Sequence, residues 1–406
     1  MPGVGYPCLL FKKLYLIGVR VQPSKIMKAD SIEVFFELVR AGLWADLEST
    51  NLWNYRFTEF VDWENVYQLA EEQSVVGVVL AGIERLKTDS PYLNVPEEIL
   101  LQWIGEVQLL EQENLAMNRF IAELIEKMRR ADIYTLLVKG QGVAQCYERP
   151  LWRASGDVDL LLSVTNYEKA KNLLIPLASE VESERLYSKH LGMTIDDKVV
   201  ELHGRLTCGL TTGIDKQIVK VQDAIFYGGE VRSWQNGCTL VFLPSADNDV
   251  IFVFTHFLKH FYKEGLGLRQ ICDWCRLLWT YRESLNHGLL ESRIKKMGLM
   301  SEWKAFGAFA VEYLGIPKEV MPLYSSDKRW KLKAEKICAF ILKVGNMGHN
   351  RDMSYFEKYP YLVRKVCSLG RRSGNLIRHA RIFPMDSLRF FPRIMFNGLR
   401  SAVRGE

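Results

Sequence analysis

Residues 153–162 read Arg-Ala-Ser-Gly-Asp-Val-Asp-Leu-Leu-Leu and place two carboxylates, Asp157 and Asp159, ahead of an apolar run. Successive side chains of a β-strand point to opposite faces, so the two carboxylates share one face while Val158 and Leu160 take the other. Two adjacent like charges raise each other's pKa unless a cation compensates them. A hard divalent cation such as Mg²⁺ prefers oxygen ligands of this kind. The stretch favours a metal-binding strand, and the alternative is an exposed strand edge with two solvated acids.

A glycine-containing turn precedes this strand. An apolar run at 133–138 stops at Lys139-Gly140-Gln141-Gly142, and a short helix is expected at 143–147. A strand that ends in such a turn and opens a helix directs backbone N–H groups toward an anion. The lysine adds a positive charge, and the two glycines let phosphate oxygens approach the backbone. Together with Arg153 in the connecting loop, the turn predicts a phosphate-binding site next to the two carboxylates.

A third carboxylate is expected on a β-hairpin. After a helix marked by a capping-box pattern at 165–168, two strands at 185–195 and 198–206 flank the turn residues 196–197. In the second strand Glu201 and His203 share one face. A hairpin lying beside the first strand brings Glu201 against the two aspartates. Three carboxylates, a divalent metal and a phosphate-binding turn form a phosphoryl-transfer site.

These residues resemble the nucleotidyltransferase superfamily in three segments, at 136–140, 156–162 and 200–203. Within that superfamily they are most similar to a bacterial branch of uncharacterised nucleotidyltransferases that is often linked with surface-polysaccharide loci. The resemblance is specific over residues 133–206. Two positions depart from the wider pattern: Gln141 stands where Ser or Gly is usual, and the third acid is Glu rather than the commoner Asp.

The resemblance implies a metal-dependent enzyme that moves a nucleotidyl group from an NTP to a hydroxyl or phosphate acceptor, such as a small molecule or a glycan. It implies Mg²⁺ or Mn²⁺ as cofactor, with Asp157, Asp159 and Glu201 as metal ligands and catalytic residues. The nucleotide phosphates would then contact the following five residues: Lys139, Gly140, Gln141, Gly142 and Arg153. The alternative is a catalytically idle nucleotidyltransferase fold that serves as a binding or assembly subunit.

Composition and periodicity set the expected architecture. The chain has 406 residues, 48% hydrophobic and 25% charged, which is typical of a globular protein with more than one domain. Apolar residues recur at helical spacing before and after the strand-rich part, so we expect an α+β fold with a mixed sheet between helical regions. The expected divisions are an N-terminal extension at 1–30, with a possible native start at Met27, a helical cap at 31–110, a core at 111–245, a helical domain at 246–360 and a basic amphipathic tail at 361–406.

The net charge and the cysteine content bear on which partners the protein binds and in which cellular compartment it lies. The net charge of +5 is mild, and no dense stripe of Lys and Arg marks the core, so nucleic acid is not an expected partner. The eight cysteines are scattered, and no apolar run approaches the length of a membrane span. Both features favour a cytoplasmic protein with reduced thiols. The spacing of Cys272 and Cys275 fits a helix better than a zinc or redox motif.

The helical segments contain further candidates for the walls of a cleft. His256 and His260 lie one helical turn apart. This spacing suits either metal ligation or histidines of the core or cleft edge whose hydrogen bonds are satisfied within the protein. Arg269 and Asp273 follow on the next helix, where they form either a salt bridge or, together with His203 and His260, part of a cleft that contacts nucleotide or acceptor. The aromatic residues of the N-terminal region favour a hydrophobic core over a base-stacking surface: Trp44, Trp53, Phe57, Phe60 and Trp63.

The C-terminal segment combines basic and aromatic residues. From 364 to 404, arginines recur between apolar side chains, and Asp386 is the acid among them. Such a pattern is typical of a helix that contacts a membrane surface, of a surface for anionic glycan, or of a basic helix packed on its own domain. The expected location is therefore cytoplasmic, with peripheral membrane contact as one option.

Overall fold

A computed structural model describes residues 31–44, 61–89, 93–227, 229, 231–263, 265–346, 374 and 376–404. The helices are α2 (Ser31–Leu43), α3 (Trp63–Glu72), α4 (Val76–Asp89), α5 (Glu97–Arg130), α6 (Gly140–Ala144), α7 (Val164–Leu174), α8 (Thr212–Phe226), α9 (Ala246–Lys263), α10 (Leu268–Thr280), α11 (His287–Met297), α12 (Met300–Leu314), α13 (Lys328–Val344) and α16 (Pro384–Arg404). Short 3₁₀ turns lie at η1 (Pro150–Trp152) and η2 (Ile175–Leu177). The strands are β1 (Thr135–Val138), β2 (Asp157–Leu162), β3 (Glu180–Val181), β4 (His190–Ile195), β5 (Lys198–His203), β6 (Val231–Asn236) and β7 (Thr239–Pro244).

Five strands form a mixed sheet in the order β1-β2-β5-β4-β3. Strand β2 pairs antiparallel with β1 and parallel with β5, and β4 returns antiparallel to β5 as a hairpin. Strands β6 and β7 form a separate two-stranded ribbon. The mixed sheet between helical regions confirms the predicted α+β fold.

Different helices pack on the two faces of the sheet. Alternate apolar residues such as Leu160 and Leu202 pack with residues of α5 and α7 in one hydrophobic core. The opposite face carries Leu161 into a second, larger core that includes residues of α9 and α10. The carboxylates of β2 share the face of Leu161, as the alternation of the strand requires. The acids therefore lie on the side of the sheet that faces the C-terminal helices.

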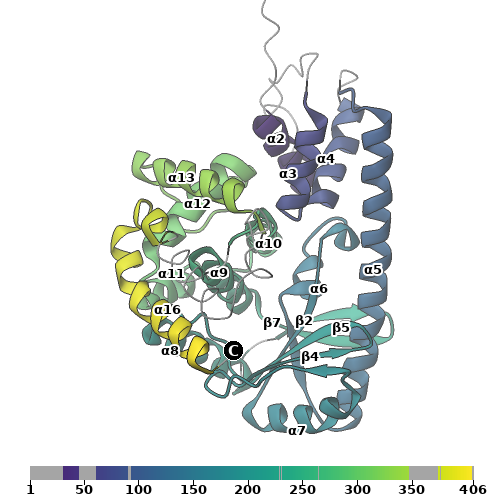
Figure 1. Ribbon diagram of the computed structural model, residues 1–406, viewed down its shortest axis with the longest axis vertical. Coiled ribbons are helices and arrows are strands. Elements are labelled where there is room, and N and C mark those ends of the chain that lie inside the picture. The colour runs from purple at the N-terminus through teal and green to yellow at the C-terminus, as the bar shows by residue number, and fades with distance from the viewer. Residues whose placement is uncertain are drawn as a thin grey trace, which may run out of the picture.

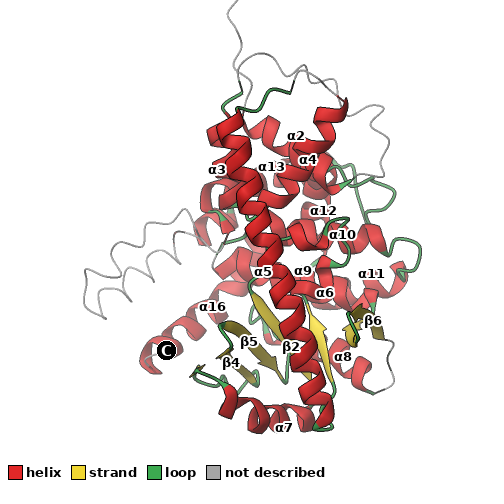
Figure 2. Ribbon diagram, turned by 90° about the vertical axis from the view of Figure 1, so that its right-hand side faces the viewer, coloured by secondary structure: helices red, strands yellow, loops and turns green. Residues whose placement is uncertain are grey.

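The helices form two groups around the sheet. In Figure 1, α2, α3 and α4 lie beside the upper half of α5, which continues down past the sheet. On the other side, α8 to α13 and the C-terminal α16 form the second group, and Figure 2 shows α5 crossing in front of the strands. Helix α5 is continuous across residue 110, where the sequence places a domain boundary. Trp44 and Trp63 are buried in the core as expected, whereas Trp53, Phe57 and Phe60 lie outside the described residues.

Some local boundaries differ from the sequence expectations. Helix α6 begins at Gly140, so the glycine turn is itself the first turn of the helix expected at 143–147. Helix α7 is capped by Ser163, which accepts a hydrogen bond from the N–H of Asn166, and not by the expected box at 165–168. The hairpin strands are shorter than expected, although the turn at 196–197 is correct. None of the described helices is long and apolar enough to cross a membrane.

Candidate active site

Three carboxylates converge from neighbouring strands. The parallel pairing of β2 and β5 places Asp159 opposite Glu201, with Asp157 two residues earlier on the same face. One carboxylate oxygen from each residue lies within 4.8 Å of the others, a spacing at which they could hold a metal ion. The acids are oxygen donors of the kind that Mg²⁺ and Mn²⁺ accept. This convergence is the geometry that the hairpin pattern predicts.

Lys139 reaches the acids from the end of β1. It follows Val138, which pairs with Asp159, and its Nζ lies 2.6 Å from Asp159 Oδ1. Lys139 and Gly140 both have positive φ angles, +58° and +41°, because the chain reverses here from β1 into α6. At Gly140 a Cβ atom would lie 3.3 Å from the carbonyl oxygen of Asp157, so a glycine suits this position on both counts.

Two histidines contact the same acids. His203 Nε2 lies 2.7 Å from Asp159 Oδ1 and 3.3 Å from Glu201 Oε2. His190, from the adjacent strand β4, places its Nε2 3.1 Å from the same Glu201 oxygen. The two histidines face each other across the hairpin, with ring centroids 4.8 Å apart. Carboxylates and imidazoles thus form one continuous polar cluster.

The cluster distributes its charge unevenly. The neighbouring charge of Asp159 raises the pKa of Asp157 above its usual value. Burial acts to raise the pKa of Asp159, but Lys139 and His203 outweigh it and lower that pKa. Burial likewise opposes ionisation of Glu201, yet hydrogen bonds from His190 and His203 lower its pKa. The surroundings therefore stabilise the ionised forms of Glu201 and Asp159, whereas they disfavour the ionised form of Asp157.

A cavity of about 980 Å³ opens beside the acids. Its walls come from the β4–β5 hairpin and from helices α8, α9 and α16, and they include Glu201 and His203. The lining also contains six Lys and Arg residues: Lys139, Arg185, Arg205, Lys259, Lys263 and Arg393. The cluster thus borders a space large enough for a substrate-sized molecule.

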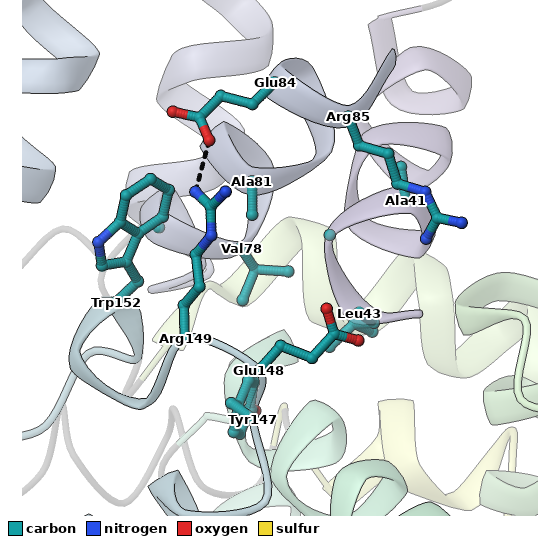
Figure 3. A pocket seen from close by; sticks show the side chains of 12 residues that line it. Ala41, Leu43, Val78, Ala81, Glu84, Arg85, Tyr147, Glu148, Arg149 and Trp152 are labelled. Carbon is teal, nitrogen blue, oxygen red and sulfur yellow. Dashed lines mark hydrogen bonds and ion pairs between the residues drawn. The ribbon is translucent and has the colours of Figure 1, made fainter. Parts of the chain in front are cut away.

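A second cavity, of about 420 Å³, lies between α2, α4 and the segment that precedes β2 (Figure 3). Arg149 stacks over Trp152 at 4.1 Å and pairs with Glu84 at 2.5 Å on its rim. None of the three acids of the cluster is among its lining residues. The larger cavity is therefore the one that adjoins the candidate site.

The remaining turn residues make structural contacts. The amide of Gln141 donates to Asn114 Oδ1 at 2.6 Å and to Ser155 Oγ at 3.0 Å, so its side chain ties the turn to α5 and to the loop before β2. At Gly142 a Cβ atom would lie 2.8 Å from Leu243 Cδ2, so the missing side chain makes room for β7. Of the four turn residues, Lys139 is the one whose side chain contacts the acids.

Arg153 and Asp273 form their ion pair with each other and not with the three acids. Arg153 donates from Nε and Nη2 to the two oxygens of Asp273, both at 2.7 Å, and Tyr147 donates to Asp273 Oδ1 at 2.8 Å. Burial would raise the pKa of Asp273, but Arg153 lowers it. The pair connects α10 to the loop before β2. It replaces the intrahelical salt bridge expected between Arg269 and Asp273, which is absent among the ion pairs of the described residues.

Arg269 contacts the loop that precedes β2. Its Nη1 donates to the carbonyl oxygen of Ala154 at 2.8 Å, and its charge acts on Asp157. Its Nε is buried and has no hydrogen-bond partner among the described residues. Burial and the charge of Arg153 lower the pKa of Arg269.

The histidines of α9 form a separate pair. Their Nε2 atoms are 3.0 Å apart, and burial holds the pKa of His256 well below its usual range. His256 lines the large cavity, whereas His260 is buried behind it. Among the described residues, the groups that could hold a metal include neither of them, nor the buried Cys272 and Cys275.

His190 is the main site residue that sequence reasoning missed. The signal was available, because a two-residue turn at 196–197 pairs Ile195 with Lys198 and, by counting outward, His190 with His203. The cavity-lining Lys259 was also missed, since one lysine on a helix carries no sequence signal of its own.

Comparison with known proteins agrees with this geometry. The model of a family described as uncharacterised nucleotidyltransferase matches residues 59–315, which is more than half of the chain and includes the whole acidic cluster. No curated protein and no solved structure matches the chain significantly. With three carboxylates on adjacent strands and a match of this extent, the chain belongs to the uncharacterised nucleotidyltransferase family.

Proposed function

We propose that this protein transfers a nucleotidyl group from an NTP to an acceptor hydroxyl or phosphate, with a divalent metal such as Mg²⁺ or Mn²⁺. The observation that carries the proposal is the convergence of Asp157, Asp159 and Glu201 within 4.8 Å on two paired strands. Family membership supplies the reaction class, and the acids supply the donor set. A bound metal would stabilise the charge that develops on the transferred phosphoryl group.

The residues of the chain have separable roles in this proposal. Asp157, Asp159 and Glu201 would hold the metal, and Glu201 at the cavity wall would also orient the acceptor hydroxyl or accept its proton. The turn at 139–142 contacts the nucleotide phosphates, with Lys139 as its charged member. Arg269 has a buried Nε without a partner among the described residues, and its charge acts on Asp157, so it is better placed than the paired Arg153 to contact a phosphate.

The cavity supports an anionic acceptor, such as a sugar phosphate or a phosphorylated glycan precursor. Positively charged side chains outnumber acids on its wall, and two of the lining acids are already paired. Glu184 binds Lys171 at 2.6 Å, and Asp215 binds Arg393 at 2.8 Å. Arg393 and Lys139 are themselves paired with acids, and the other four basic residues of the wall favour a ligand with negative charge. A sugar acceptor from surface-polysaccharide synthesis fits this description.

Release of pyrophosphate tests the function. The full chain is incubated with Mg²⁺, each of the four NTPs and a panel of sugars and sugar phosphates, and product is followed with an α-labelled NTP. We expect acceptor-dependent pyrophosphate release that Asp157→Asn and Glu201→Gln abolish. Asp197→Asn in the exposed hairpin turn is the matched control. NTP binding that needs neither metal nor Asp157, without turnover, would instead favour the idle binding subunit.

The exposed side chains of the C-terminal helix support contact with a membrane surface. Phe383 and Phe390 are buried against the domain, so α16 is packed, but Met385 and Leu388 are 75% and 70% exposed beside Arg389. Exposed apolar and basic side chains together favour an anionic lipid surface. Flotation with liposomes of anionic lipid tests this, and equal flotation of Met385→Asp/Leu388→Asp and the wild type would remove the membrane contact.

A further inference from the structure

Two imidazoles and a carboxylate meet at one point beside the three acids. His190 on β4 and His203 on β5 are direct partners in the hairpin, and both direct Nε2 toward Glu201 Oε2, at 3.1 and 3.3 Å. The donor atoms of the three residues all lie within 4.8 Å of one another. This cluster of His190, Glu201 and His203 shares only Glu201 with the three carboxylates.

The distances suit a common metal ion. Metal–nitrogen and metal–oxygen bonds of about 2.0–2.2 Å place neighbouring ligands of one ion roughly 3.0–3.4 Å apart. The two nitrogen–oxygen distances at Glu201 fall in that range. Asp159 Oδ1, 2.7 Å from His203 Nε2, offers a further oxygen at the same place. The atoms need little movement to become ligands of one ion.

We propose that His190, His203 and Glu201 form a binding site for a transition-metal ion such as Mn²⁺, Co²⁺ or Zn²⁺, next to the site of the three carboxylates. Imidazole nitrogen selects such ions over Mg²⁺, which prefers oxygen ligands. The neutral imidazole is the ligand, so the ion replaces the protons through which the histidines contact the carboxylates. Glu201 has two oxygens and is the residue that both sites share.

The ion has a route to this position. All three ligands line the large cavity, and none of them is sealed from it. His256 and His260 on α9 differ from this cluster. Among the described residues, no carboxylate lies close enough to both of them to complete a metal-binding group. The proposal does not depend on transferase activity, since it concerns binding of the ion alone.

The test uses Mn²⁺ as the probe and pulsed electron paramagnetic resonance as the readout. The full chain is stripped with a chelator, supplied with excess Mg²⁺ and titrated with Mn²⁺. We expect one bound Mn²⁺ with hyperfine coupling to imidazole nitrogen. Asp157→Asn, which disables only the carboxylate site, should retain the ion and the coupling. The wild-type spectrum decides whether imidazole binds the ion, so a variant that fails to fold cannot hide that result.

Single substitutions then assign the ligands. His190→Gln and His203→Gln should each weaken Mn²⁺ binding at least about tenfold, as loss of a ligand or its support does. His287→Gln, on the exposed start of α11, is the matched control and should bind Mn²⁺ like the wild type. A Mn²⁺ spectrum without nitrogen coupling would overturn the proposal and leave the histidines as hydrogen-bond partners of the acids. Loss of the ion in Asp157→Asn would overturn it as well, because the histidine cluster would then not bind by itself.

Discussion

Asp159 and Asp273 are both buried aspartates with a basic partner, yet their surroundings differ. Asp273 has one guanidinium on its two oxygens and a tyrosine hydroxyl, so its charge is fully matched. Asp159 has Lys139 and His203, but two further carboxylates stand within 4.8 Å of the same place. The first group is a closed salt bridge that joins two parts of the fold. The second has an excess of negative charge that a cation from solution would balance, which is the basis for proposing it as the metal site.

The same chemical change, Asp to Asn, should have opposite effects in the two groups. Asp157→Asn should lower nucleotidyl transfer by about 10³-fold or more, since the metals supply several kcal/mol of transition-state stabilisation. It should not lower thermal stability in the absence of metal, because it removes the repulsion that raises the pKa of Asp157. Steady-state kinetics and calorimetry on the same preparation measure both. An inactive variant that is also unstable would contradict the contrast.

Asp273→Asn should instead destabilise the protein. It leaves Arg153 buried without its charge partner, which costs about 3–5 kcal/mol of unfolding free energy. Denaturant unfolding with Asp197→Asn as the exposed control measures this loss. The double variant Arg153→Met/Asp273→Leu should recover most of the stability, because no buried charge then remains unpaired. If Asp273→Asn were as stable as the wild type, the pair would not be the structural group that its geometry indicates.

A third buried carboxyl group, that of Glu302, extends the comparison to the pH dependence of stability. Burial raises the pKa of Glu302 from 4.5 to about 8, and Tyr262 donates a hydrogen bond to it at 3.1 Å. Because the folded state holds this proton more tightly than the unfolded state, Glu302 contributes stability below pH 4.5. That contribution is lost as pH rises toward 8, at up to about 1.4 kcal/mol per pH unit.

Glu302→Gln keeps the hydrogen-bond acceptor and removes the titration. Unfolding free energies measured from pH 5 to pH 8 should therefore fall less steeply in this variant than in the wild type. If the two pH profiles were parallel, Glu302 would not titrate in this range. The distinction between Glu302 as a neutral buried acid and Asp159 and Asp273 as ionised ones would then be wrong.

The smallest effect is expected at Gln141. Its side chain contacts Asn114 and Ser155 and not the acids. Gln141→Ala should cost about 1–3 kcal/mol of stability from the lost buried hydrogen bonds and should change the turnover number little. Stability and turnover are measured together with those of the Asp157 variant. A large loss of turnover at unchanged stability would show that the side chain contacts the nucleotide.

The sequence was most informative in the strands, where alternation alone decides which face of the sheet each side chain takes. The period of two in β2 and in the hairpin places Asp157, Asp159 and Glu201 on one face, and the structure has them there. A two-residue turn fixes the hairpin register, so His190 could have been assigned by the same rule. Long apolar periodicities likewise predicted the flanking helices.

Contacts between segments that are distant in the sequence could not be predicted from such patterns. Arg153 and Asp273 are 120 residues apart in the chain, so no local spacing predicts their pairing. Glycines are ambiguous for a similar reason: Gly140 serves the chain reversal, whereas Gly142 makes room for Leu243 on β7. The neighbouring residues in the sequence do not tell a glycine required by a chain reversal from one required by packing.

The central claim is that the three carboxylates bind a divalent metal together with an NTP. The most direct measurement is anomalous diffraction from crystals of the full chain grown with Mn²⁺ and a non-hydrolysable NTP. We expect an anomalous peak bounded by Asp157, Asp159 and Glu201, with the triphosphate beside Lys139. Ordered nucleotide with no peak at these acids, or a peak only elsewhere, would contradict it.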